Sequence, residues 1–506
     1  MRLTMIWCLL LAQWLTYSGD DRGTRHSALT EITPANVHQL RAVWTFQTGV
    51  LGKWESTPLV VGDVVYATGP DNHAWAIDAR TGRQIWRYAR TLPSGIKPCC
   101  GRVNRGFAIH GDKLLMATLD AHLVALEMKT GKVVYDVEID DFRKGYAATA
   151  APLVVKQRVI VGIAGAEFGV RGFLDAYDAN TGARAWRFWT VPEPGRPGSE
   201  TWPQDNAWEH GGGPTWLTGT YDSELNTLYW GTGNPSPLYF GEGRKGDNLY
   251  TNSLIAIDAD SGTLRWHYQF TPHDTHDWDS NHVPVLGDVP IGGVTRKVVM
   301  VANRNGFFYT LDRTNGRLLV ATPFVKTTWA TEIGPDGRPR LLPDQEPTAA
   351  GTMTCPDLFG GTNFMSPSYD PARTLFFVTA RETCGVYFSR AVTYVEGQRY
   401  DGGGMRREGE SYGAVRAIDP ATGARRWEYR LEKASLSGVM STASGLVFGG
   451  DFDGHVFALD AGTGRQLWRY QMGAPLYSAP MTHLVDGAQH VLIGAGTTLT
   501  AFALPK

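Results

Sequence analysis

Apolar and polar positions alternate in one phrase that recurs along the chain: a short apolar strand, an Asp, a Thr-Gly-like turn and a second strand with an aromatic residue. Apolar alternation on both sides of an Asp-x-x-x-Gly turn predicts a β-hairpin, with the Gly in the left-handed conformation. Two further apolar strands precede each hairpin, as at 56–63 and 64–70 before the first. Four antiparallel strands per unit, repeated around an axis, predict a β-propeller. The phrase occurs at residues 75–88, 124–137, 175–188, 255–268, 309–322, 416–429 and 457–470.

The number of units predicts how such a propeller closes. Seven units are complete, and an eighth supplies only three strands, at residues 476–487, 488–496 and 498–506. Residues 42–49 carry a strand of the same pattern, with Trp44 at its aromatic position. Because pairing the two ends would remove an exposed sheet edge, we expect an all-β fold: one eight-bladed β-propeller over residues 14–506, with tryptophan-docking-type repeats, closed by this N-terminal strand. We read the repeat tryptophans as structural wedges between blades: Trp44, Trp86, Trp186, Trp266, Trp427 and Trp468.

Composition agrees with this fold and excludes some partners. The chain has 59 Gly, 28 Pro and 17 Trp with 19% charged residues, which suits short strands and many turns. A net charge of −2 gives no sign of nucleic-acid binding or of a polybasic membrane contact. Outside the N-terminus, no apolar run approaches the roughly 20 residues that span a bilayer. Two long Gly/Pro-rich excursions, at 191–250 and 323–412, are typical of functional or covering loops.

The N-terminus predicts a location for the protein. Apolar residues 5–12 follow a single Arg2, as in a short secretory signal. We therefore read residues 1–13 as a signal-like segment and expect a periplasmic protein, with an N-terminal core segment as the alternative. Export would place the cysteines beyond this segment where disulfides persist.

Two of the five cysteines, Cys99 and Cys100, are adjacent. Neighbouring Cα atoms lie about 3.8 Å apart, whereas disulfides usually span about 4.4–6.8 Å, so bonding this pair would make a strained eight-membered ring. The dipeptide alone therefore favours two reduced thiols over a ring, and both readings stay open at this point. The chain contains no C-x-x-C-H motif, which excludes covalent c-type haem within it.

Several polar stretches are not required by the repeat. Singly, each reads as a turn or a cap, but together they offer oxygen ligands, an aromatic platform and a guanidinium near corresponding ends of blades, which converge on one mouth of a propeller. The oxygen donors suit Ca²⁺ or a similar hard cation rather than zinc, and His273 and His276 are better read as surface or supporting residues. The stretches contain Glu167, Trp216, Asn234, Asp277 with Asp279, and Arg304.

With these residues in order, the chain resembles the pyrroloquinoline quinone (PQQ)-dependent alcohol dehydrogenases of the methanol and ethanol type. The resemblance runs from about Trp14 to the C-terminus. Its most specific elements are the adjacent cysteines with 104–106, GAEFGVRG at 165–172, GTGNP at 231–235, the HD…DWD stretch at 273–279, and RNGFFYTLDRTNG at 304–316.

The resemblance implies a role for each of these residues. Glu167 and Asn234 would bind the metal, Asp277 would be the general base, and Arg304 would bond the quinone oxygens. Trp216 would form the floor under the cofactor. The Cys99–Cys100 ring, which is also counted among the catalytic residues, would form its ceiling. The remaining cofactor contacts implied are Glu55, Arg105, Thr149, Gly165, Ala166 and Asn363, and a second, structural disulfide is implied for Cys355 and Cys384.

The implied activity is oxidation of a primary alcohol to the aldehyde by hydride transfer to a metal-bound quinone. Electrons would then pass to an external, soluble cytochrome c or similar carrier. The chain departs from the methanol-type pattern at Ala164 and Pro214, where relatives carry hydroxyl residues, and at Leu436, where many carry tryptophan. These changes put two hydrogen bonds to the cofactor and the shape of the pocket in doubt.

Asp279 bears on the identity of the metal. Alternation along an extended segment would put Asp277 and Asp279 on one face, giving three carboxylates and one amide with Glu167 and Asn234. So much negative charge favours a lanthanide(III) ion over Ca²⁺, and in the resembled family an Asp at this position marks the lanthanide-dependent members. The alternative is a solvated Asp in a charged loop.

Two other functions remain as alternatives. A non-catalytic propeller scaffold of the cell envelope explains the repeat but leaves the polar residues unexplained, and a PQQ-dependent sugar dehydrogenase would use the same quinone. The alcohol, the electron acceptor and the oligomeric state stay open, a homodimer being one option.

Overall fold

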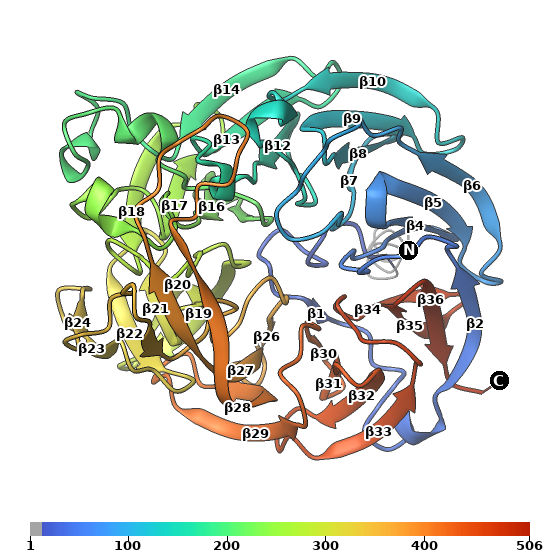
Figure 1. Cartoon of the computed structure of the whole chain (residues 1–506). Coiled ribbons are helices and arrows are strands. Elements are labelled where there is room, and N and C mark those ends of the chain that lie inside the picture. The colour runs from blue at the N-terminus through green and yellow to red at the C-terminus, as the bar shows by residue number, and fades with distance from the viewer. Residues whose placement is uncertain (1–12, 506) are drawn as a thin grey trace.

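The computed structural model describes residues 13–505, which form an all-β propeller whose sheets follow one another around a ring (Figure 1). The expected all-β propeller architecture is therefore confirmed. The signal-like segment expected at 1–13 lies outside the described residues except for Gln13. Between residues 13 and 505, no helix is long and apolar enough to cross a membrane.

The sheets of the first part of the ring each contain four strands that pair in sequence order. They are β3–β6 (Leu59–Val61, Val64–Thr68, His73–Asp78, Gln84–Ala89), β7–β10 (Ala108–His110, Lys113–Ala117, His122–Glu127, Val133–Glu138), β11–β14 (Leu153–Val155, Arg158–Gly162, Phe173–Asp178, Arg184–Trp189), β15–β18 (Thr220–Asp222, Thr227–Gly231, Ser253–Asp258, Leu264–Gln269) and β19–β22 (Val285–Ile291, Val294–Ala302, Phe307–Asp312, Leu318–Pro323).

Later sheets recruit strands from elsewhere in the chain. The strand β1 pairs in parallel with β30, and β2 pairs antiparallel with β36, which places Thr45 opposite Thr500. The members are β25–β29 (Thr352–Thr354, Ser368–Asp370, Leu375–Ser389, Gly403–Ile418, Arg425–Leu431), then β1 with β30–β33 (His26–Ser27, Met440–Thr442, Leu446–Gly450, His455–Asp460, Gln466–Gln471), then β2 with β34–β36 (Arg41–Gln47, Met481–Val485, Ala488–Ala495, Thr498–Ala503), and a separate β23–β24 hairpin (Ala330–Ile333, Pro339–Leu341).

Short 3₁₀ turns make up the helical content of the described residues. They are η1 (Val37–Gln39), η2 (Pro70–Asn72), η3 (Phe142–Lys144), η4 (Ala166–Phe168), η5 (Ser199–Thr201), η6 (Ala207–His210) and η7 (Gly241–Arg244).

The repeat phrase folds through its own turn chemistry. In its first copy, β5 and β6 are joined by a turn in which Asp78 Oδ1 accepts the N–H groups of Arg80 (3.1 Å) and Thr81 (2.9 Å). Gly82 completes the turn at φ 70°, in the left-handed region where glycine is favoured. These contacts confirm the hairpin predicted at 75–88.

Five of the six repeat tryptophans pack on the turn of the next sheet. Trp44 Nε1 donates to Ala79 O (2.9 Å) and Trp86 Nε1 to Met128 O (2.9 Å). A Cβ on Gly82 would lie 2.8 Å from the Trp44 ring, so glycine is also required here by the close approach. Equivalent ring-on-glycine contacts join Trp186 to Gly262, Trp266 to Gly316 and Trp427 to Gly464, and Trp468 lies edge-on to Phe502. The structural role expected for these tryptophans is confirmed.

The topology also determines which loops can meet. In an antiparallel four-stranded sheet, the connection from strand two to strand three and the connection to the next sheet leave from the same end. The polar stretches lie in these connections: between β6 and β7, β12 and β13, β14 and β15, β16 and β17, β18 and β19, and β20 and β21. The ring therefore gathers them at one end.

Candidate active site

A cavity of about 300 Å³ lies among these loops. With one exception, the residues singled out from the sequence for cofactor, metal and catalysis all line it: Glu55, Cys99, Cys100, Arg105, Thr149, Gly165, Glu167, Trp216, Asn234, Asp277, Asp279, Arg304 and Asn363. The exception is Ala166, which is buried in η4, lies outside the lining and uses its carbonyl to accept Ser236 Oγ–H (2.6 Å). The cofactor contact implied for Ala166 therefore stays a prediction.

Adjacent cysteines and a tryptophan line the cavity. Cys99 and Cys100 are joined in a disulfide with their Cα atoms 3.8 Å apart, so the ring implied by the resemblance is present. Their sulfurs lie near Glu167, with Cys100 Sγ 3.9 Å from Glu167 Oε1, but bonded sulfurs offer no thiolate to a metal. The second implied disulfide, between Cys355 and Cys384, is also present.

One edge of the cavity is a buried ion pair. Arg105 Nη2 bonds Glu55 Oε2 (2.7 Å) and its Nη1 donates to Thr149 Oγ1 (2.8 Å). The Arg105 guanidinium also lies 5.0 Å above the ring of Trp216. Burial raises the pKa of Glu55, and the charge of Arg105 opposes this rise. Because Glu55 and Thr149 hold Arg105 in place, the guanidinium fixes one side of the Trp216 indole.

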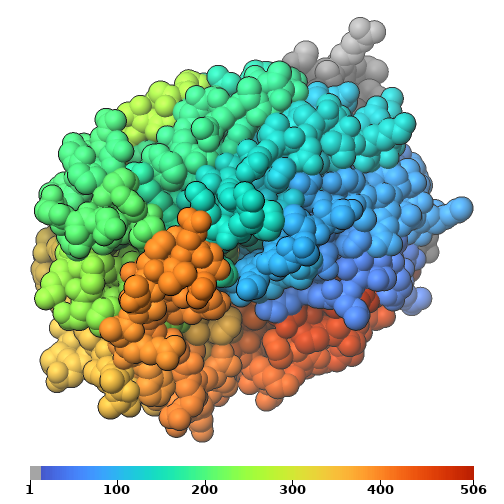
Figure 2. Space-filling view, turned by 45° about the horizontal axis from the view of Figure 1, so that its top comes forward, coloured from blue at the N-terminus to red at the C-terminus, as the bar shows by residue number. Residues whose placement is uncertain are grey.

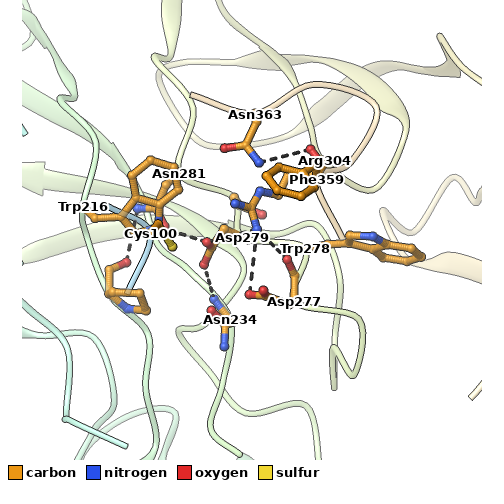
Figure 3. Close-up of polar contacts among 12 residues, drawn as sticks. Cys100, Trp216, Asn234, Asp277, Trp278, Asp279, Asn281, Arg304, Phe359 and Asn363 are labelled. Atoms are coloured by element: carbon orange, nitrogen blue, oxygen red, sulfur yellow. Dashed lines mark hydrogen bonds and ion pairs between the residues drawn. The ribbon is translucent and has the colours of Figure 1, made fainter. Parts of the chain in front are cut away.

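Asp279 is the hub of the polar network (Figure 3). Its Oδ1 accepts the N–H of Asn234 (2.8 Å), and its Oδ2 accepts Trp216 Nε1–H (3.0 Å) and lies 3.2 Å from Arg304 Nη1. The Asp279 carboxylate thus orients the backbone of Asn234, the Trp216 indole and the Arg304 guanidinium together. Its side chain is buried, so it is not the solvated loop residue of the alternative reading.

Asp277 lies next to Asp279 in the cavity, and its backbone has an unusual conformation. Its φ is 60°, in the left-handed region, so the segment is not extended. The expectation that strand-like alternation puts Asp277 and Asp279 on one face is therefore wrong, although both carboxylates line the cavity. Arg304 Nη1 lies 3.8 Å from Asp277 Oδ1 and donates to the Asp277 carbonyl (2.6 Å). Burial raises the pKa of Asp277 well above its usual range; the charge of Asp279 adds to this, and that of Arg304 opposes it.

Glu167 completes the acidic group. Burial raises the pKa of its carboxyl to about 7, and the negative charge of Asp279 contributes to the rise. Three carboxyl groups face one guanidinium here; burial disfavours the anionic forms of Glu167 and Asp277, and a cation bound among them would stabilise those forms. Oxygen donors from carboxylates and the Asn234 amide are ligands for a hard ion.

Some lining residues were not found from the sequence. Leu358, Phe359 and Phe364 come from the long excursion at 323–412, which carries no repeat pattern, and Lys53 lies beside Glu55. The three departures from the methanol-type pattern also reach the lining: Ala164, Pro214 and Leu436.

His282 is a further residue that the sequence did not single out. Its Nδ1 is 3.0 Å from Asn363 O, and its Nε2 accepts the N–H of Arg304 (3.0 Å). Burial, assisted by the charge of Arg304, lowers the pKa of His282 to about 3, so the ring is neutral and donates through Nδ1. The ring ties the backbone of Arg304 to that of Asn363. Its only sequence signal is its position five residues after Asp277.

Comparisons with known proteins agree with this site. Residues 14–325 match the family described as glucose/ethanol/alcohol dehydrogenase, beta-propeller domain, and residues 411–504 match one described as outer membrane protein assembly factor BamB. Quinoprotein alcohol dehydrogenase PedH of Pseudomonas putida is 38% identical over 94% of this chain and 84% of its own length. The lanthanide-dependent methanol dehydrogenase of Methylacidiphilum fumariolicum is 36% identical over 96% of this chain and 84% of its own length.

A solved structure gives the same result in three dimensions. A europium-containing methanol dehydrogenase superposes with a TM-score of 0.93 at 33% identity, covering 99% of this chain and all of that one. Similarity of this extent in sequence and fold, with the disulfide, the carboxylates and the arginine in one cavity, identifies the family. The chain belongs to the PQQ-dependent alcohol dehydrogenases.

Proposed function

We propose that this protein oxidises a primary alcohol to the aldehyde with PQQ and one metal ion, and passes the electrons to a separate cytochrome c-like acceptor. The observation that carries the proposal is the single cavity in which the disulfide, Trp216, the acidic residues and Arg304 meet. The 506 residues given contain no C-x-x-C-H motif for a covalent haem, which supports an acceptor outside them.

The residues fit a flat, anionic cofactor. Trp216 offers an aromatic face, and the disulfide and the Glu55–Arg105–Thr149 edge border the same cavity. Arg105 Nε and Arg304 Nε are buried without a hydrogen-bond partner among the described residues, so each retains a donor for a ligand oxygen. When bound, the quinone supplies the oxidising group and the metal supplies a Lewis acid.

The acidic wall fits the metal. Glu167, Asn234, Asp277 and Asp279 would hold it through carboxylate and amide oxygens. The raised pKa values of Glu167 and Asp277 mean that burial disfavours their anionic forms, and a cation would restore them. We propose a lanthanide(III) ion over Ca²⁺, because attraction to three carboxylates grows with the charge of the ion.

The chain's own groups provide the acid–base part of the reaction. Asp277 would accept the proton of the alcohol hydroxyl, since its carboxylate faces the cavity. Arg304 is aimed between Asp277 and Asp279 and would stabilise negative charge that develops on the quinone side. Its backbone is held by His282, so the guanidinium starts from a fixed position.

The finer points of architecture and location belong to the same proposal. Eight sheets of four or five strands among residues 13–505 support eight blades in one domain over residues 14–506. The pairing of β2 with β36 supports closure of the ring by the N-terminal strand. The apolar residues 5–12 behind Arg2 support a cleaved signal and a periplasmic location, and a homodimer is the oligomeric state we would test first.

A reconstitution assay tests the proposed function. Metal-free protein would be loaded with PQQ plus La³⁺ or Ca²⁺, and dye-linked oxidation of primary alcohols and of glucose would be measured. We expect turnover of primary alcohols that needs both additions, and little with glucose. Activity with glucose alone would support the sugar dehydrogenase alternative, and no binding of the quinone would support the scaffold.

A further inference from the structure

A long hairpin lies over the site. The strands β27 and β28 pair from Phe376–Ile418 out to Ser389–Gly403, and residues 390–402 form their connecting segment, here called the hairpin tip. Figure 2 shows this orange segment lying against the green surface of earlier sheets. Tyr239 N donates to Asp401 O (2.9 Å) in the tip, which places the tip beside the segment that follows Asn234.

The turn that carries Glu167 is held from outside itself. The η4 turn has only three residues, and it lies between Gly165 (φ 130°) and Gly169 (φ 64°). So short a 3₁₀ turn has little stability of its own. Remote groups bind two of its carbonyls: Ser236 Oγ–H donates to Ala166 O, and Tyr400 N–H from the hairpin tip donates to Glu167 O, both at 2.6 Å.

Aromatic packing anchors the tip at this point. The rings of Tyr394 and His210 are stacked, with centroids 3.5 Å apart and planes 17° apart, and Tyr394 meets Tyr400 edge-on at 5.6 Å. A Cβ on Gly169 would lie 2.9 Å from the Tyr400 ring and 3.1 Å from that of Tyr394. The two tyrosines are therefore seated directly on the residue that ends the η4 turn.

We propose that the hairpin tip is a clamp that positions Glu167 for the metal, with Tyr394 and Tyr400 as positioning residues. The inference rests on the proposed function, because it takes Glu167 as a metal ligand. A ligating carboxylate binds well only when its backbone is fixed to within a fraction of an ångström. Loosening the tip therefore frees the η4 turn and weakens metal binding, although no tip residue is itself a ligand.

Metal binding to the PQQ-loaded, metal-free protein tests the clamp without any measurement of turnover. La³⁺ would be titrated calorimetrically, and its release would be timed after addition of a chelator. Losing the stack in Tyr394→Ala is expected to weaken La³⁺ binding about three- to tenfold and to speed release by a similar factor. Tyr394→Phe keeps the ring and should restore wild-type values.

A matched control and a second variant keep the test sharp. Val395 neighbours Tyr394 in the tip but is 48% exposed, so Val395→Ala should bind La³⁺ within about twofold of wild type. His210→Ala removes the other half of the stack from a different element. The double variant with Tyr394→Ala should lose less La³⁺ affinity than the sum of the two single losses, because both substitutions remove the same stack.

The outcomes separate the clamp from the function on which it rests. If wild type binds La³⁺ and Tyr394→Ala and His210→Ala both bind like Val395→Ala, the clamp is wrong and the metal site stands. If wild type binds neither La³⁺ nor Ca²⁺ in the presence of PQQ, the metal site itself falls, and the clamp falls with it.

Discussion

Neutralising Asp279 should change which metal the protein prefers. The carboxylate accepts hydrogen bonds from Asn234 N and Trp216 Nε1 and pairs with Arg304 Nη1, so Asp279→Asn keeps its size while removing one of three negative charges. A unit charge about 4 Å from a cation contributes ~4 kcal/mol per unit of ionic charge at an effective permittivity of about 20. A trivalent ion therefore loses about 4 kcal/mol more than a divalent ion, an upper value that equals roughly a thousandfold in affinity.

The assay compares two titrations on the same protein. Hydration of the freed site offsets part of the electrostatic loss, so we expect the ratio of La³⁺ to Ca²⁺ affinity to fall at least about 30-fold in Asp279→Asn. Isothermal titration calorimetry of quinone-loaded, metal-free protein gives both constants. An unchanged ratio would refute the assignment of Asp279 to the metal, whereas full activity of wild type with Ca²⁺ and none with La³⁺ would refute the preference for a lanthanide.

Three further predictions concern the base, the disulfide and acid stability. Asp277→Ala should lower alcohol turnover by about 10²–10⁴ with an unchanged circular dichroism spectrum, and near-wild-type turnover would remove Asp277 as the base. Mass spectrometry of an unreduced digest should find Cys99 bonded to Cys100; two free thiols would contradict the structure. Burial lowers the pKa of His483 to about 3, so below a pH of about 6.5 the unfolded chain binds a proton that the folded chain does not, and the free energy of unfolding falls as the pH drops. His483→Phe should remove about 2 kcal/mol of the stability that wild type loses between pH 7 and 5, measured by urea unfolding. Identical pH dependence of the two proteins would count against this prediction.

Local chemistry made much of the fold predictable. The Asp78 turn binds its own following N–H groups, and Gly82 supplies the left-handed conformation, so each hairpin is encoded within about 14 residues. The Trp44 contact with Gly82 reaches the neighbouring sheet, but the repeat gives it the same sequence signal in each unit. Because the same tryptophan and glycine recur in successive units, this contact between sheets could be predicted from the sequence.

The sequence predicted which residues belong to the site better than it predicted how they are arranged. Asp277 and Asp279 both reach the cavity, yet Asp277 does so at φ 60° and not by alternation, because side chains pointing inward from an irregular loop follow no period. Ala166 shares the motif of Glu167, but its side chain lies outside the lining, and motif membership does not say which way a residue faces.

The contacts of the long excursion could not be predicted. Phe359 reaches the cavity and Tyr400 reaches Glu167, across 233 positions of sequence in the second case, from a segment without the repeat. Such pairings depend on the path of the β27–β28 hairpin over the ring, and one sequence carries no local trace of that path. His282 was missed for a similar reason, since its partners Arg304 and Asn363 are distant in the chain.

A single-turnover experiment decides most directly whether this protein is a PQQ-dependent alcohol dehydrogenase. Protein loaded with PQQ and La³⁺ would be mixed anaerobically with a primary alcohol and no electron acceptor, while the absorbance of the bound quinone and the aldehyde formed are followed together. We predict reduction of the bound quinone and about one aldehyde per bound quinone, because each turnover moves two electrons. Bound quinone that stays oxidised, with no aldehyde released, would contradict the proposed function.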